Sequence, residues 1–162
     1  MPDMLVKLYE LPEEVARYAK PYEGTPITIR RALPPERHVI TRWVEDTFNP
    51  HWRSECETAL SRQPVTCYIA TSADEGGATR MVGFGCYDAT AKGFFGPTGV
   101  DPEFQGRGIG KALLFACLDA MRAEGYGYAI IGSAGPADFY AKAVGAVPIE
   151  GSSPGIYRGM LR

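Results

Sequence analysis

The chain has 162 residues, of which 45% are hydrophobic and 22% are charged, and its formal net charge is −2. This length is enough for one domain with a full core, and the composition is that of an ordinary globular protein. The small net charge gives no reason to expect a nucleic acid or an anionic membrane as a partner.

No apolar run approaches the length of about 18 residues that a membrane span needs, and Met1–Glu10 lacks the apolar centre of a signal peptide. The four cysteines form no C-x-x-C pair, and the two histidines are not spaced like zinc ligands. Because each cysteine lies in an apolar context, we expect buried free thiols, a reducing compartment and no metal. We therefore expect a cytoplasmic protein. The cysteines are Cys56, Cys67, Cys86 and Cys117.

Residues 1–26 differ from the rest of the chain. A short strand-like run at 4–11 precedes a short helix at 12–20, which Pro12 opens, and residues 21–26 are rich in turn formers. We expect this segment to be an N-terminal extension that packs on a core domain of residues 27–162.

Hydrophobic periodicity predicts alternating strands and helices across residues 27–162. Short turns join three consecutive strands, which predicts an antiparallel meander with Cys67 and Ile69 on one face. The expected strands are residues 27–33, 65–71, 80–89, 94–100, 128–131, 146–150 and 156–161. The expected helices are residues 36–48, 51–62, 137–144 and one that follows residue 110 and ends at Glu124–Gly125.

The most informative segment is Gln105–Lys111, which places glycines at 106, 108 and 110 between a strand and an amphipathic helix. This arrangement offers free backbone N–H groups and a helix N-terminus to a phosphate. A nucleoside-triphosphate P-loop does not fit, because Gln105 and Ala112 replace the glycine and the hydroxyl residue that it needs. A dinucleotide fingerprint does not fit either, because the third glycine comes one residue early and no carboxylate follows near residue 128.

Gln105, Gly108 and Gly110 match the pattern Gln/Arg-x-x-Gly-x-Gly/Ala, and the segment resembles the pyrophosphate loop of the GNAT acetyltransferase superfamily. Thr98–Phe104 resembles that family's fourth strand and its exit, and Phe139–Ala146 resembles its Tyr-x-Lys-x-Gly-Phe segment with one extra residue. The resemblance covers about residues 27–162. It implies an α/β (α+β) domain with a mixed, mostly antiparallel sheet of about seven strands and about four flanking helices.

The resemblance implies acetyl-CoA as the cofactor, with its pyrophosphate on the loop and its pantetheine arm beside strand 94–100. Pro97 cannot donate to a ladder, which is consistent either with a gap beside this strand or with an ordinary bulge. The usual asparagine is missing from Gly132–Pro136, where Ser133 can hydrogen-bond instead. The expected cofactor-binding residues are Thr98, Gly99, Val100, Gln105, Gly106, Arg107, Gly108, Ile109, Gly110, Lys111, Ser133, Tyr140 and Lys142.

The implied reaction is aminolysis of a thioester, which needs a neutral amine, an oxyanion donor and a proton for the leaving thiolate. The resemblance assigns the thiolate's proton to Tyr140, and the position of Val100 makes its N–H the expected oxyanion donor. Among several carboxylates we choose Glu55 as the base. If helix 51–62 forms a wall of the acceptor site, Trp52, Phe84 and Phe94 bind the acceptor, with His51 and Tyr68 nearby.

The sequence thus predicts an N-acetyltransferase that acts on a primary amine of a small molecule or a peptide. The alternative is a non-catalytic acyl-CoA-binding or sensor module of the same fold, which keeps the loop without turnover. A homodimer formed through residues 1–26 is compatible with either function.

Overall fold

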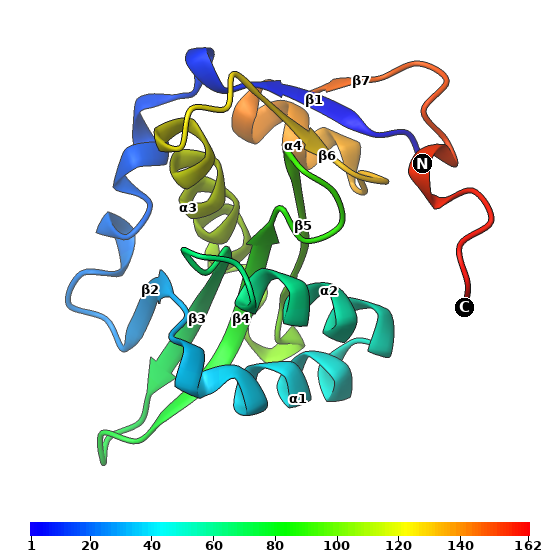
Figure 1. Ribbon diagram of the computed structural model, residues 1–162. Helices are drawn as coiled ribbons and strands as arrows, with labels where there is room; N and C mark the ends of the chain where they lie inside the picture. The colour runs from blue at the N-terminus through cyan, green and yellow to red at the C-terminus, as the bar shows by residue number, and fades with distance from the viewer.

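The computed structural model describes residues 1–162, which form a seven-stranded sheet in the order β2-β3-β4-β5-β6-β1-β7 (Figure 1). All neighbouring strands are antiparallel except β5 and β6, which are parallel. The strands are β1 (Met4–Lys7), β2 (Ile27–Arg31), β3 (Cys67–Ala73), β4 (Thr79–Tyr87), β5 (Phe94–Val100), β6 (Tyr128–Ile131) and β7 (Val147–Pro148). The helices are α1 (Arg37–Thr47), α2 (Pro50–Leu60), α3 (Ile109–Ala123) and α4 (Ala137–Val144), and single 3₁₀ turns connect several elements.

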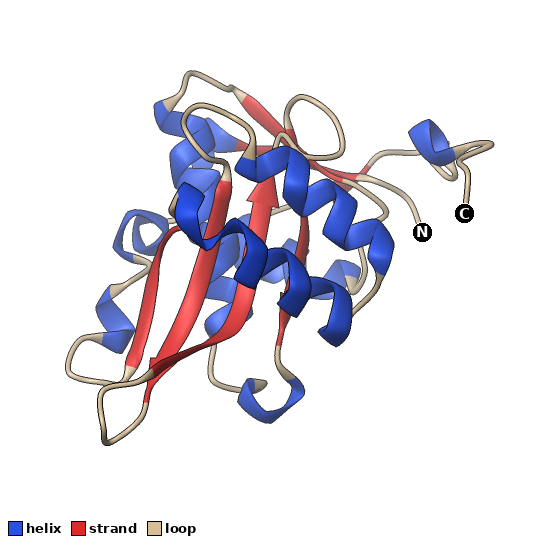
Figure 2. Ribbon diagram, turned by 60° about the horizontal axis from the view of Figure 1, so that its bottom comes forward, coloured by secondary structure: helices blue, strands red, loops and turns tan.

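Helices α1 and α2 cover one face of the sheet, and α3 lies on the other (Figure 2). Along each strand, successive side chains point to opposite faces of the sheet, one toward α1 and α2 and the next toward α3. Cys67 and Ile69 pack under α1 and α2, whereas Tyr68 and Ala70 pack with α3. The expected meander and the shared face of Cys67 and Ile69 are therefore confirmed. No helix is both long enough and apolar enough to cross a membrane.

The N-terminal segment 1–26 contributes a strand, β1, to the sheet. Strand β1 lies between β6 and β7, antiparallel to both, and Met4 faces Ile131 on one side and Pro148 on the other. Met4 and Val6 are buried in the core on the α3 side. The residues after Lys7 continue as 3₁₀ turns, and the expected helix at 12–20 is only the 3₁₀ stretch Glu13–Arg17.

The prediction of a last strand at 156–161 is wrong. This segment contains one 3₁₀ turn, Gly155–Tyr157, and no strand. Glycines with positive φ at 151, 155 and 159 interrupt any regular ladder there, and β1 occupies the place in the sheet beside β6. The predicted strand 146–150 shrinks to the two residues of β7.

Strands β5 and β6 separate soon after they begin. They pair only at Phe94 with Ile130 and at Phe95 with Ile131, so the rest of β5 has no neighbour on this side. On its other side, β5 places both Gly96 and Pro97 opposite Cys86 of β4, which is a bulge. Both readings of Pro97 thus apply: the proline sits in a bulge, and the gap opens on the opposite edge of the same strand.

Candidate active site

The glycine loop forms the N-terminus of α3. Gly106 and Gly108 have φ of +81° and +77°, in the left-handed region that favours glycine, and Gly108 is the N-cap residue of the helix. Residues 105–108 are exposed, and a Cβ on Gly106 would meet no atom within 4 Å. The amides of the first turn of α3 have no partner within the helix. The loop therefore presents backbone donors and a positive helix end to open space.

Tyr22 of the N-terminal segment 1–26 and the turn at 101–104, which follows β5, hold the loop in place. The Tyr22 hydroxyl donates a hydrogen bond of 2.9 Å to the Arg107 carbonyl oxygen. The Arg107 guanidinium lies 4.6 Å from the centre of the Phe104 ring. Asp101 caps the turn that carries this ring by accepting a hydrogen bond of 2.9 Å from the Glu103 N–H. Arg107 is thus directed along the loop, where its charge can reach a phosphate.

The edge of β5 that faces the gap carries free backbone donors. The Asp101 N–H donates to the Val82 carbonyl of β4 over 2.8 Å. Because successive N–H groups of a strand point to opposite sides, those of Thr98 and Val100 point away from β4 and into the gap. Gly99 is required by packing on the α1–α2 face, because a Cβ there would lie 2.8 Å from two atoms of the Phe48 ring and closer to a third.

A cavity of about 660 Å³ lies where β5 and β6 part. Its walls are the N-terminal half of α2, the middle of β5, the end of β6 with residues 132–135, and Tyr140 of α4. Met1 and five of the last ten residues of the chain, among them Tyr157, close another side. The cavity thus contains both residues that we expected to be catalytic, Tyr140 and Glu55.

Tyr140 lies in the first turn of α4 and is only 7% exposed. Its ring packs edge-on against Phe95 of β5 and Phe139, at centroid distances of 6.5 and 5.1 Å. No residue of the chain hydrogen-bonds its hydroxyl. Burial raises the pKa of Tyr140 above the usual value, so the hydroxyl keeps its proton at neutral pH and can donate it toward the cavity.

Glu55 enters the cavity from α2. Asn49 caps this helix by accepting a hydrogen bond of 2.8 Å from the Trp52 N–H, and Pro50 occupies its first position. The Glu55 carboxylate accepts a hydrogen bond from the Thr90 hydroxyl. Burial raises the pKa of Glu55, and the Thr90 hydrogen bond and the nearby His51 oppose this shift. A carboxylate with a raised pKa is a better base than an exposed one.

Sequence reasoning missed Tyr157, because residues 156–161 were expected to be a strand. Its ring reaches over the end of β6, where a Cβ on Gly132 would overlap the tyrosine hydroxyl. Burial raises the pKa of Tyr157, and the charge of Glu55 raises it further. Thr90, in the turn between β4 and β5, was also missed. No local sequence pattern marks either residue, because each is brought to the cavity by the packing of segments that lie far apart in the sequence.

The structure places the remaining predicted residues at differing distances from the cavity. Trp52 and His51 line it, as do Thr98 and Ser133. Phe84 has no exposed surface and lies behind Trp52, 6.1 Å from it between ring centroids.

Other predicted residues lie outside the cavity lining. Phe94 packs against Gly132, and Tyr68 is buried on the α3 face. Lys142 is exposed on α4. The Ser133 N–H is already used, since it donates to Asp3 Oδ1 over 2.8 Å.

Comparison with known proteins identifies a family. The profile of the acetyltransferase (GNAT) family matches residues 33–145. The fold is similar to a region titled GCN5-related glucosamine N-acetyltransferase in a fungal multi-domain GH3 β-N-acetylglucosaminidase, with a TM-score of 0.70 and 17% identity over 91% of this chain and 19% of that chain. No protein with a curated description matches the chain.

Two bacterial proteins titled GCN5-related N-acetyltransferase have the same fold. The protein from Sphaerobacter thermophilus gives a TM-score of 0.58 and 22% identity over 91% of this chain and 48% of that chain. The protein from Kribbella flavida gives a TM-score of 0.54 and 18% identity over 91% of this chain and 53% of that chain. The chain therefore spans between a fifth and about half of these three structures, and the likeness shows a shared fold.

Proposed function

Because the chain belongs to the GNAT acetyltransferase family, we propose that it transfers the acetyl group of acetyl-CoA to a primary amine of a small molecule or a peptide. The observation that carries the proposal is the cavity at the parting of β5 and β6, which holds Tyr140 and Glu55 together. Strand β5 links this cavity to the glycine loop, so one extended ligand with a phosphate end and a reactive end suits both.

The loop would bind the pyrophosphate of CoA. The exposed amides at the start of α3 would donate to its oxygens, and Arg107 and Lys111 would add positive charge. The pantetheine arm would lie along the free edge of β5 and accept a hydrogen bond from the Val100 N–H, next to the loop. The thioester would then lie in the cavity, which Thr98 lines and Val100 does not. Its carbonyl oxygen would therefore lie near the Thr98 N–H, and not near that of Val100 as the sequence indicated, and this N–H would stabilise the developing negative charge.

The acceptor amine must lose a proton, since a free amine of the lysine type has a pKa near 10.4. Glu55, whose pKa is raised by burial, would take this proton directly or through one water. The nitrogen then forms a bond to the acetyl carbon as the carbon–sulfur bond breaks. Tyr140 would protonate the departing thiolate, and a second proton, lost by the nitrogen as the amide forms, would restore the tyrosine. The proton on Glu55 would pass to solvent. The reaction consumes one amine and one thioester and yields an amide and free CoA.

The test is acceptor-dependent release of free CoA, measured with a thiol reagent across a panel of amines. The panel should include amino sugars, because the fungal relative is titled a glucosamine N-acetyltransferase, together with polyamines and peptides with free N-termini. Tyr140→Phe should lower the rate by about 10²-fold or more, the usual scale for a lost general acid. Tyr128→Phe is the matched control, because this tyrosine is 51% exposed and lies outside the cavity.

Calorimetry separates this proposal from a non-catalytic acyl-CoA-binding module. Binding of acetyl-CoA without CoA release for any amine would support the module. Absence of acetyl-CoA binding would contradict both functions. A Tyr140→Phe variant that keeps the full rate would leave the transfer reaction standing and remove the tyrosine from it.

A further inference from the structure

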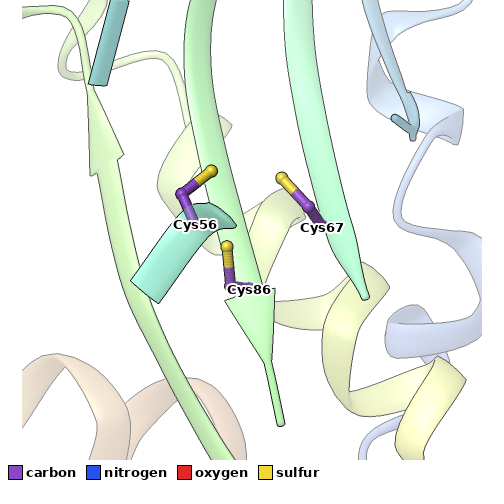
Figure 3. A group of neighbouring side chains, drawn as sticks. All are labelled: Cys56, Cys67 and Cys86. Carbon is purple, nitrogen blue, oxygen red and sulfur yellow. The ribbon is translucent and has the colours of Figure 1, made fainter. Parts of the chain in front are cut away.

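Three of the four cysteines meet at one point in the core. Cys56 comes from α2, Cys67 from β3 and Cys86 from β4, and their sulfur atoms all lie within 4.8 Å of one another. Figure 3 shows the three sulfurs facing the space between them. Cys117, the fourth cysteine, lies on α3 on the opposite face of the sheet. We call Cys56, Cys67 and Cys86 the thiol cluster.

The fold holds the thiol cluster rigidly. Cys67 and Cys86 are directly opposite each other in the β3–β4 register, so their side chains leave the same face of the sheet side by side. Cys56 lies on the face of α2 that packs onto these strands. All three residues have no exposed surface. The positions of the sulfurs are therefore set by three packed elements and not by flexible loops.

The surroundings of the cluster are apolar. The residues packed around it are apolar, among them Ile40, Ala59 and Leu60, and no histidine or carboxylate joins the group. The only other polar contact is a weak one, in which the Cys67 thiol donates to the Tyr68 carbonyl oxygen over 3.8 Å. A site built from these residues is three-coordinate, closed to water and made entirely of sulfur.

This donor set selects among metals. A structural zinc ion takes four ligands in a tetrahedron, and a catalytic zinc ion keeps a water in the fourth position, so a dry site with three sulfurs does not suit it. Thiolate ligands select soft ions, of which Cu(I) is one. A metal–sulfur bond of about 2.3 Å would place three sulfurs about 4 Å apart around one ion, within the spread that the cluster shows.

We propose that Cys56, Cys67 and Cys86 form a binding site for one Cu(I) ion. Binding breaks sulfur–hydrogen bonds, forms copper–sulfur bonds and releases the protons to solvent, and nothing is oxidised or reduced. Two thiolates and one thiol around a monovalent ion leave one net negative charge. The ion would fix α2 to the sheet one residue from Glu55.

The experiment uses the full chain, fully reduced and without oxygen, and supplies copper as the coloured Cu(I)–bicinchoninate complex. The wild-type protein should take one copper ion per chain from the complex, and its melting temperature should rise. Cys67→Ala should lose this uptake. Cys117→Ala is the matched control, because it also removes a buried free thiol but lies outside the cluster, and it should keep the full stoichiometry. Zn(II) offered with a chelator of moderate affinity should not be retained.

X-ray absorption of the copper-loaded wild-type protein gives a measurement that does not depend on any variant. A first shell of sulfur alone is expected, and a shell with nitrogen or oxygen would overturn the assignment. Failure of the wild-type chain to take copper from bicinchoninate would overturn it too, as would equal uptake by a folded Cys67→Ala. Acetyl-CoA binding, measured on the same samples, should persist in Cys67→Ala, so the outcome is independent of the proposed transferase activity.

Discussion

Gly99→Ala tests how the packing of α1 and α2 controls the exposed edge of β5. Gly99 has no positive φ, so the cost of a side chain there comes from collision alone. A Cβ would lie 2.8 Å from two atoms of the Phe48 ring, where ordinary contact begins at 3.4 Å, and the ring is enclosed by Trp43, Trp52 and Phe84 at centroid distances of 5.7, 5.0 and 5.8 Å. Overpacking of this kind costs about 1–3 kcal/mol.

Urea unfolding of four proteins measures this cost: the wild type, Gly99→Ala, Phe48→Ala and the double variant. Gly99→Ala alone should lower the free energy of unfolding by about 1–3 kcal/mol, which is about 2–12 °C in melting temperature at this chain length. In the Phe48→Ala background the same change should cost close to nothing, since the ring is absent. Gly127→Ala is the control, because a Cβ there meets no atom within 4 Å and φ is not positive. An equal cost in both backgrounds would refute the collision.

Further variants test the site itself. In a rate–pH profile, Glu55→Gln should remove an ascending limb centred above the ordinary glutamate pKa, because burial raises that pKa and the base acts only when ionised. Gly108→Ala should weaken acetyl-CoA binding in calorimetry and cost about 1–2 kcal/mol of stability, since residue 108 has φ of +77°. Tyr22→Phe removes the hydrogen bond to the Arg107 carbonyl and should raise KM for acetyl-CoA while kcat stays near its wild-type value. Asp3→Ala should lower the free energy of unfolding by about 1–3 kcal/mol, because it removes the acceptor of the Ser133 N–H.

The parts of the site that depend on local chain chemistry could be predicted from the sequence. The glycines at 106, 108 and 110 indicated a loop that offers free backbone N–H groups at a helix start, and the structure gives Gly106 and Gly108 positive φ at the start of α3. The predicted helix 51–62 is α2, Pro50–Leu60. The seven-strand sheet with four helices was also predicted, partly from strand and helix periodicity and partly from the family resemblance. The predicted strand 156–161 is not one of the seven, whereas β1 is.

The parts that depend on distant pairing could not be predicted. Strand β1 has four residues, and its place between β6 and β7 is decided by partners more than a hundred residues away. The approach of Tyr157 to the cavity follows from that placement. The thiol cluster was hidden for a similar reason: its cysteines lie on three elements, and only the β3–β4 register and the docking of α2 bring them together.

The position of β1 also explains how both ends of the chain come to shape the site. Because β1 lies beside β6, the Asp3 carboxylate reaches the end of that strand and accepts a hydrogen bond from the Ser133 N–H. The Asp3 N–H donates a hydrogen bond of 2.7 Å to the Ser152 hydroxyl oxygen. The Ile149 N–H donates to the Asp3 carbonyl over 2.8 Å and ties the chain after β7 to the same point. The final residues then have no strand to join and fold back along the cavity, which brings Tyr157 over Gly132. Residues 1–7 therefore shape the cavity, which Met1 lines and which Asp3 supports through Ser133 and the chain after β7, so removing them is expected to alter the cavity.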